Sequence, residues 1–568
     1  MISRWSQPVV RHRLNPAMAA LLALIVAFFC VQLRFIHLRA DTPEKVSNNI
    51  GLYVDEGYKT LAPRNLVIFG ENSAHQADQY KGWMKASPLT NWPYYFMFKW
   101  LGVEIENARL VTIAYFALFI LLFSLAVAGR YRITLLLVGI FALSLQHTLY
   151  FFSRVALLEV PIVTLLYGSL FLFIKTNDNR IYRKIKWLAV LIFLSAFGIK
   201  ISALLYFFVA GCMGLLSFLA GFSYHEKKKV YATIAVGLIL VVITAFFYFD
   251  FWWHRIGHSP FFIMVRALNN PLLIHADIFL LLIGISCGLQ GLICQPELYL
   301  GNLYRAALLG LVLLGPIVLS IFPYNPLRYY VPLVPAYILL ILEWLYLSTW
   351  RESLAQNGNW FSDTLAFLML FHLIFYVGVL FNEYFIKLLQ IMIGDEPGLS
   401  DAGMVMFFAP IAAIVTVAIF ILRKRIFSKK IFAGLITGFA VMGLVYNVSI
   451  LSDFVLNPSY KSREIQADIE SIVPGAAIVA GDWAPFFLIG TRILALYMND
   501  KFNRKNVASI RPDFFLDSDN RNSRGNAEVI RDIDGASFGA PVLNAVYVFT
   551  DVTLYPVLYD KSKGLGEP

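Results

Sequence analysis

Long apolar stretches, separated by short polar or basic segments, fill most of the chain. A helix crosses the hydrocarbon core of a bilayer with about 20 apolar residues. Runs of this kind occupy residues 14–36, 107–128, 133–152, 158–175, 230–249, 277–295, 304–322, 331–348, 361–381, 403–422 and 431–451. One further run, 187–222, is too long for a single span, and Lys200 interrupts it. The pattern therefore predicts an α-helical polytopic membrane protein.

Basic segments decide how often the run 187–222 crosses the membrane. RIYRKIK (180–186) precedes it and HEKKK (225–229) follows it, and clusters of this kind mark cytoplasmic loops. An even number of crossings must therefore separate them, so the run is expected to form two spans that meet near Lys200. The result is a prediction of about thirteen transmembrane helices, with the amino terminus in the cytoplasm and the tail outside it.

The composition agrees with a membrane protein, since 59% of the residues are hydrophobic and 15% are charged. A net charge of +11 could indicate a nucleic-acid partner. The basic residues, however, lie in short clusters between the apolar runs, such as RKRIFSKK (423–430), which favours the lipid bilayer over nucleic acid as the partner. The four cysteines lie within apolar runs and indicate no disulfide framework. We expect a multi-pass protein of a bacterial-type inner (plasma) membrane.

The predicted first external loop, residues 37–106, is unusually long for a connection between membrane helices. It contains LYVDEGYKT (52–60), in which Asp55 and Glu56 form an adjacent pair of acids among aromatic residues. It ends with the aromatic segment WPYYFMFKWLG (92–102), which is suited to lying along the membrane interface.

The tail differs from the rest of the chain. ADIESIVPGAAIVAGDWAPFFLIG (467–490) has the pattern of an amphipathic helix, a turn and a strand, and NAVYVFTDVTLY (544–555) that of another strand. The sequence thus predicts a transmembrane domain at 1–451 and a small extracytoplasmic α/β domain at 452–568.

Charged side chains gather near the outer ends of the predicted spans. Besides the acids of the first loop, they are Arg154, Glu159, Lys200 and Arg328. A charge deep in the membrane opposes insertion by up to about 3 kcal/mol, so such groups usually face the interior of the bundle, where they are paired or functional. Acids and cations at one membrane level predict a polar cavity for an anionic ligand.

Five motifs in this order resemble those of the GT-C glycosyltransferases. Besides the acidic motif of the first loop and WPYY, they are SRVALLEVP (153–161), GIKIS (198–202) and RYYVPLVPAY (328–337). The pattern is most similar to lipid A aminoarabinose transferases and protein O-mannosyltransferases, and GAAIVAGDWAP (475–485) resembles the start of their small external domain. The resemblance implies a helical bundle with an outer cavity. It also implies transfer of a sugar, usually with inversion, from a polyprenyl phosphate donor to a lipid, glycan or protein acceptor outside the cytoplasm.

The resemblance also implies roles for individual residues. The acids expected to be catalytic are Asp55, Glu56 and Glu159, with Asp55 as the general base. Glu159 stands where many relatives have an aspartate, which leaves its role open between acceptor orientation, pairing with Arg154 and metal binding. The residues expected to bind the donor or its phosphate are Arg154, Lys200, Arg328 and Tyr329.

Structural roles compete with each of these assignments. Asp55 could cap a helix that begins near Glu56, and Arg154 could form an ion pair with Glu159 that joins two spans. Lys200 could extend its side chain to the membrane interface. Arg328 could likewise be an interface anchor.

Two further questions stay open at the level of the sequence. No histidine shows the spacing of a known metal motif, so no cofactor is assigned, although a divalent metal is compatible with the acids. A polytopic transporter or flippase of a lipid-linked or anionic substrate is the alternative function. Transporters often carry internal repeats with matching helix breaks, and no such pair is visible here.

Overall fold

The computed structural model describes residues 16–43, 51–73, 87–127, 133–178, 203–219, 271–320, 327–348, 360–381, 401–421, 429–498, 509–518, 521–533, 535–547 and 550–559, with a few short pieces between them, among them 199–200. The predicted span 230–249 and the two basic segments that flank the run 187–222 lie outside these residues. The expected number of thirteen helices therefore stays a prediction.

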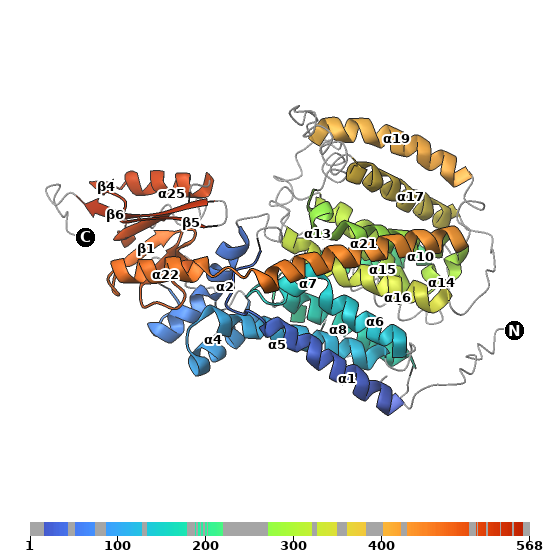
Figure 1. Ribbon diagram of the computed structural model, residues 1–568, viewed down its shortest axis with the longest axis horizontal. Helices are drawn as coiled ribbons and strands as arrows, with labels where there is room; N and C mark the ends of the chain where they lie inside the picture. The colour runs from blue at the N-terminus through green and yellow to red at the C-terminus, as the bar shows by residue number, and fades with distance from the viewer. Residues whose placement is uncertain are drawn as a thin grey trace.

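Apolar helices form the larger body of the molecule, on the right of Figure 1. They are α1 (Pro16–Gln32), α5 (Ile105–Val127), α6 (Ile133–Leu145), α7 (His147–Phe152), α8 (Glu159–Asp178), α10 (Ala203–Leu219), α13 (Pro271–Cys294), α14 (Pro296–Leu300), α15 (Leu303–Ser320), α16 (Val334–Ser348), α17 (Trp360–Phe381), α19 (Asp401–Ile421) and α21 (Lys429–Leu456). Apart from the short helices α7 and α14, each corresponds to a predicted span. α5 packs on α8, α10 on α15, and α13 on α16 and α17.

The apolar helices identify a membrane protein. Within the described residues, four helical stretches are long and apolar enough to cross a membrane, namely Ile105–Val127, Asp277–Cys294, Arg328–Leu347 and Ile436–Ile472. Shorter apolar helices accompany them. Phe29, Ile414 and Leu444 are examples of large apolar side chains exposed on the outside of the bundle. Such a surface fits hydrocarbon and not water.

Two predicted spans are interrupted near the end of the bundle that faces the small domain. The run 133–152 is divided at Gln146, whose extended backbone ends α6 and whose side chain accepts a hydrogen bond from Leu149 N as the cap of α7. The run 331–348 starts as the 3-10 helix η5 (Leu327–Leu333), which contains Pro332, and continues as α16. Proline removes a backbone donor, which is one reason why a regular helix does not extend through this segment.

The first loop folds into helices that lie beside the small domain (Figure 1). α2 (Gly51–Ile68) carries the acidic motif, and α4 (Pro88–Leu101) carries the aromatic one. The possibility that Asp55 caps a helix is wrong, because α2 begins at Gly51 and Asp55 lies inside it. On α4, Trp92, Phe96 and Trp100 form an exposed aromatic stripe at intervals of four residues. This stripe suits the predicted position of the segment at the membrane interface.

The tail forms a small α/β domain, on the left of Figure 1. Its elements are α22 (Lys461–Ile472), β1 (Ile478–Gly481), α23 (Ala484–Phe487), β2 (Leu494–Tyr497), β3 (Phe514–Asp517), α25 (Arg521–Arg531), β4 (Ala536–Phe538), β5 (Leu543–Tyr547) and β6 (Thr550–Tyr559). β1 pairs in parallel with β2 and β3, and β6 pairs antiparallel with β3, β4 and β5. The sheet is continuous across these pairs.

One prediction for the tail is wrong. The segment 544–555 is not a single strand but the hairpin of β5 and β6, in which Tyr547 pairs with Thr550. Residues 545–549 are all apolar and run across the turn, so no polar or glycine-rich segment along the chain reveals the reversal.

The two ends of the bundle differ. α1 begins at the end far from the small domain and finishes next to it, at the 3-10 turn η1 (Leu33–Phe35) (Figure 1). α21 runs along the bundle in the same overall direction and delivers the chain to the domain at Leu456. The side that faces the cytoplasm stays a prediction from the charge pattern.

Candidate active site

Four charged residues from four separate segments meet at the domain end of the bundle. Asp55 comes from α2, Glu159 is the first residue of α8, Lys200 follows the short piece at Ile199, and Arg328 belongs to η5. Arg328 Nη1 contacts Asp55 Oδ2, and its Nε lies 3.9 Å from Glu159 Oε1. Lys200 Nζ donates to the same Glu159 oxygen at 2.9 Å. We call these four residues the charged cluster.

The charged cluster is largely withdrawn from solvent. The exposed fractions of the side chains are 3% for Glu159, 9% for Arg328, 14% for Asp55 and 19% for Lys200. Interactions between charges are stronger here than in water, and each charge needs a partner. The pairing of two acids with two cations meets that need, and a bound anion could replace an acid as the partner of a cation.

The aromatic ring of Tyr329 lies close to both cations of the charged cluster. Its ring centroid lies 4.3 Å from Lys200 Nζ and 5.6 Å from Arg328 Cζ, within the range of a cation–π interaction. Its backbone oxygen accepts a hydrogen bond from Tyr206 OH at 2.6 Å. The expected group of Lys200, Arg328 and Tyr329 is thus brought together.

Lys59 was missed by the sequence analysis. It lies one helical turn after Asp55 on α2 and is half-buried, and its Nζ donates to Tyr58 OH at 2.6 Å. Burial, together with the positive charge of Lys200, lowers the pKa of Lys59 to about 7, although Glu159 acts in the opposite direction. Its spacing of four residues from Asp55 places both side chains on one helix face, which is a signal that the sequence contained.

Glu56 occupies a different place from the one expected. Its side chain is fully buried and accepts hydrogen bonds from Arg109 Nε at 2.8 Å and Arg109 Nη2 at 3.0 Å. Ala156 N donates to it as well, at 2.8 Å. The carboxylate therefore fixes α2 against α5 and the turn before α8, and it does not face the charged cluster. Consecutive residues on a helix point about 100° apart, which separates Glu56 from Asp55.

Arg154 is also placed differently from the expectation. Its guanidinium donates to the backbone oxygens of Arg34, Ile36 and His37 at 2.6 to 3.0 Å. Arg154 therefore lies outside the charged cluster, and it does not form the alternative ion pair with Glu159. A turn between the two residues directs their side chains to different partners. Glu159 pairs with the cations of the charged cluster instead.

The acids of the cluster do not form a recognisable metal site. Within the part of the chain that the structure describes, no three His, Cys, Asp or Glu side chains gather. The carboxylates of Asp55 and Glu159 are both engaged by cations.

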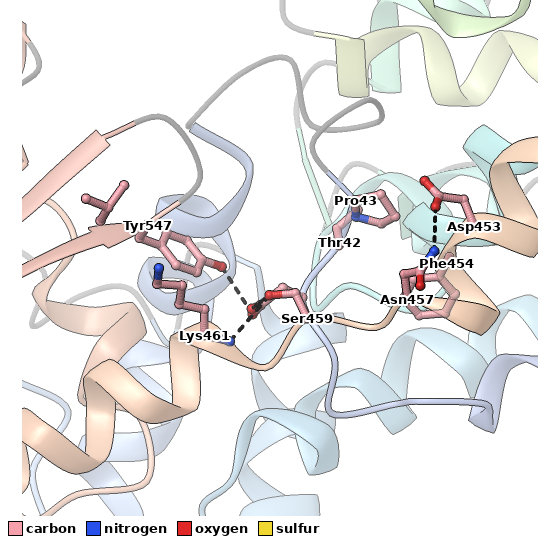
Figure 2. A pocket seen from close by; sticks show the side chains of 10 residues that line it. Thr42, Pro43, Asp453, Phe454, Asn457, Ser459, Lys461 and Tyr547 are labelled. Atoms are coloured by element: carbon pink, nitrogen blue, oxygen red, sulfur yellow. Dashed lines mark hydrogen bonds between the residues drawn. The ribbon is translucent and has the colours of Figure 1, made fainter.

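A cavity of about 190 Å³ opens elsewhere, at the junction between α21 and the small domain (Figure 2). Its wall includes Asp41, whose carboxylate accepts hydrogen bonds from Ser459 Oγ at 3.0 Å, from Tyr547 OH at 3.2 Å and from the hydroxyl of Ser462. Asp453, also in the wall, binds Asn457. The hydrogen bonds of Asp41 thus link the segment after η1 to the start of α22 and to β5 of the small domain.

The fold is similar to that of ArnT from Cupriavidus metallidurans bound to undecaprenyl phosphate, with a TM-score of 0.50, 14% sequence identity, and coverage of 95% of this chain and 97% of that chain. This likeness in fold agrees with the helical bundle and small C-terminal domain that the motifs predicted. The apo state of the same protein gives a TM-score of 0.48 at 14% identity, with the same coverage. No protein-family model and no curated protein matches the chain.

Proposed function

We propose that this protein is a membrane glycosyltransferase. It transfers a sugar from a polyprenyl phosphate donor to a lipid, glycan or protein acceptor at the outer face of a bacterial-type inner membrane. The observation that carries the proposal is the charged cluster, in which a carboxylate on an extramembrane helix meets two cations at one end of the bundle. The fold that the chain shares with ArnT, a protein crystallised with undecaprenyl phosphate, supports it.

Lys200 and Arg328 are assigned to the donor phosphate. In the transfer step, the bond between the anomeric carbon and the phosphate oxygen breaks, and its electrons pass to the departing polyprenyl phosphate. The negative charge on the phosphate thereby increases. Preorganised cations in a dry site stabilise such charge more than water does. Tyr329 holds both cations in position, and Glu159 keeps them paired until the anion arrives.

Asp55 is assigned as the general base. It takes the proton from the acceptor hydroxyl or amine as that atom bonds to the anomeric carbon on the face opposite the phosphate, which inverts the anomeric configuration. In the absence of donor, the carboxylate of Asp55 is engaged by Arg328. When the phosphate draws Arg328 toward itself, the carboxylate is released and can accept the proton. Donor binding thus prepares the base.

The direct test is a transfer assay. The purified protein in nanodiscs is incubated with a panel of polyprenyl phosphate sugars and membrane extracts, and products are identified by mass spectrometry. We expect one donor to lose its sugar to an acceptor. If no donor is consumed, and proteoliposomes free of lipid-linked sugar instead accumulate a labelled solute, the alternative function of a transporter would replace the proposal.

A further inference from the structure

α2, the helix that carries Asp55, lies between the bundle and the small domain (Figure 1). Its faces have separate partners. Asp55 faces the charged cluster, and Glu56 binds Arg109 of α5. A third face, with Gly57 and Leu61, packs on α23 of the small domain. The position of Asp55 therefore depends on two bodies and not on the bundle alone.

Arg64 is the strongest link between α2 and the domain. Its side chain is fully buried, and its Nη2 donates to the backbone oxygens of Leu488, Thr491 and Ile493 at 2.7 to 2.9 Å. Its Nε donates to the oxygen of Ile489 at 3.0 Å. One guanidinium thus satisfies the carbonyl groups left open where α23 ends.

Gly57 permits an unusually close approach on the same face. A Cβ at this position would lie 2.7 Å from the carbonyl carbon of Pro485 and still closer to the nitrogen of Phe486. Leu61, one turn further, joins the apolar cluster of the domain that includes Trp483 and Phe487. α2 is therefore fitted against the backbone of α23, with no room for a side chain between them.

The domain also contacts α2 close to Asp55. Tyr497 of β2 stacks on Tyr58 of α2, with ring centroids 4.9 Å apart and planes 17° apart. Tyr58 is the residue to which Lys59 donates. The aromatic stack links a strand of the domain to the helix face that carries Asp55.

The domain is held to the rest of the protein independently of α2. Asp41 binds Ser459 and Tyr547 at the junction shown in Figure 2. Arg463 of α22 donates to both carboxylate oxygens of Glu106 at the start of α5, at 2.9 and 2.7 Å. The small domain is thus attached to α5 and to the segment that follows η1. It can therefore hold α2 in position without relying on α2 for its own attachment.

We propose that the C-terminal domain is a brace that sets the position of Asp55 through α2, with Arg64 as the positioning residue. This role rests on the function proposed above. Arg64 lies about 13 Å along the helix axis from Asp55. Pro63 removes one backbone hydrogen bond between them, but α2 continues through it and so connects the two positions. A displacement of about 1 Å at a catalytic group can reduce the rate about a hundredfold.

The test compares Arg64→Met, Arg64→Lys and Gly57→Ala in the full chain. In Arg64→Met we expect kcat to fall at least about tenfold, while KM for the donor changes less than about threefold, because Lys200 and Arg328 stay in place. Arg64→Lys keeps a donor and should recover part of kcat. Gly57→Ala forces α23 away while leaving every hydrogen bond of Arg64 chemically available, and it should lower kcat in the same way.

A matched control separates positioning from general loss of stability. Arg34 is also fully buried and donates to backbone oxygens, those of Cys30 and Ser144, but it is not on α2. Arg34→Met should lower the melting temperature and leave kcat per folded molecule near the wild-type value. Hydrogen exchange of the α2 amides, which requires no activity, should accelerate in Arg64→Met and not in Arg34→Met.

The outcomes are distinct. The brace is overturned if folded Arg64→Met and Gly57→Ala keep the wild-type kcat. It is also overturned if Arg34→Met loses as much kcat as they do. Either result leaves the proposed function standing. If the wild-type chain transfers no sugar from any donor, the proposed function fails. In that case hydrogen exchange still tests the brace. If the α2 amides exchange equally fast in the wild type and in Arg64→Met, the brace is overturned as well. Faster exchange in Arg64→Met supports the role of Arg64 in holding α2 against the domain.

Discussion

Asp55 and Arg328 form an ion pair between α2 and the 3-10 helix η5, which leads into the apolar helix α16. Glu159 lies on the other side of the guanidinium, 3.9 Å from its Nε. The cation therefore stands between two acids, and an incoming phosphate competes with both of them for it. Under the proposed mechanism, this exchange of partners connects donor binding to the release of the base.

Replacement of Asp55 by Asn should reduce the rate of sugar transfer at least about a hundredfold, which is the lower end of the contribution of a general base. The donor should bind with equal or higher affinity, since Arg328 loses a competing carboxylate. Turnover and donor affinity in nanodiscs measure the two effects. Asp453→Asn, an exposed acid of α21 bound to Asn457, serves as the control and should be fully active. Wild-type turnover in Asp55→Asn would transfer the role of base to Glu159.

Lys200→Met and Arg328→Met should each lose about 2 to 4 kcal/mol of transition-state stabilisation, a rate reduction of about thirty to a thousandfold. The reason is the loss of one charge-assisted contact to the phosphate in a site with little solvent. Single-turnover kinetics with the lipid-linked donor provides the measurement, and Lys461→Met, an exposed lysine of α22, provides the control. Near-normal rates in both variants would remove these residues from the donor site.

Glu56→Gln should act on folding rather than on chemistry. The change leaves the charge of Arg109 buried without its carboxylate, which should reduce the free energy of unfolding by on the order of 3 kcal/mol. Turnover per folded molecule should fall less than about tenfold, because the side chain does not face the charged cluster. Thermal unfolding followed alongside activity separates the two, with the exposed Glu464→Gln as the control. A stable but inactive Glu56→Gln would restore Glu56 to the catalytic group.

Lys59 should make donor binding depend on pH. Its pKa of about 7 means that the side chain is charged below pH 7 and attracts the phosphate, and that it becomes neutral above that pH. The donor should therefore bind more tightly at pH 6 than at pH 8 in the wild type, and Lys59→Met should remove this difference. Lys99→Met on the exposed side of α4 should retain it. The same pH dependence in Lys59→Met and the wild type would contradict the assignment.

Protein stability provides a second measurement of the same group. The pKa of Lys59 in the fold lies below the ordinary lysine value of 10.5, so the unfolded chain binds more protons between about pH 7 and pH 10.5. Burial of this lysine therefore lowers the free energy of unfolding, and the whole of this unfavourable contribution is present below pH 7. It decreases as the pH rises from 7 and is gone above about 10.5. Lys59→Met should flatten that rise in the free energy of unfolding.

The sequence by itself determined the parts of this protein that depend on local pattern. Apolar runs of bilayer length defined the helices of the bundle, since a membrane requires each span to satisfy its own backbone and to present apolar side chains. Charges near the ends of such runs are costly, so six charged residues could be selected as candidates before their contacts were known, namely Asp55, Glu56, Arg154, Glu159, Lys200 and Arg328. Four of the six form the charged cluster. The amphipathic start of the tail likewise indicated a separate α/β unit.

The tertiary structure decided which of those charges meet. Asp55 and Glu56 are adjacent in the chain, yet helical rotation directs one to Arg328 and the other to Arg109. The turn before Glu159 separates it from Arg154, and the hairpin of β5 and β6 divides a stretch in which the apolar residues 545–549 run across the turn. Such partners are set by packing between segments distant in the chain, and no local periodicity records which segment lies opposite.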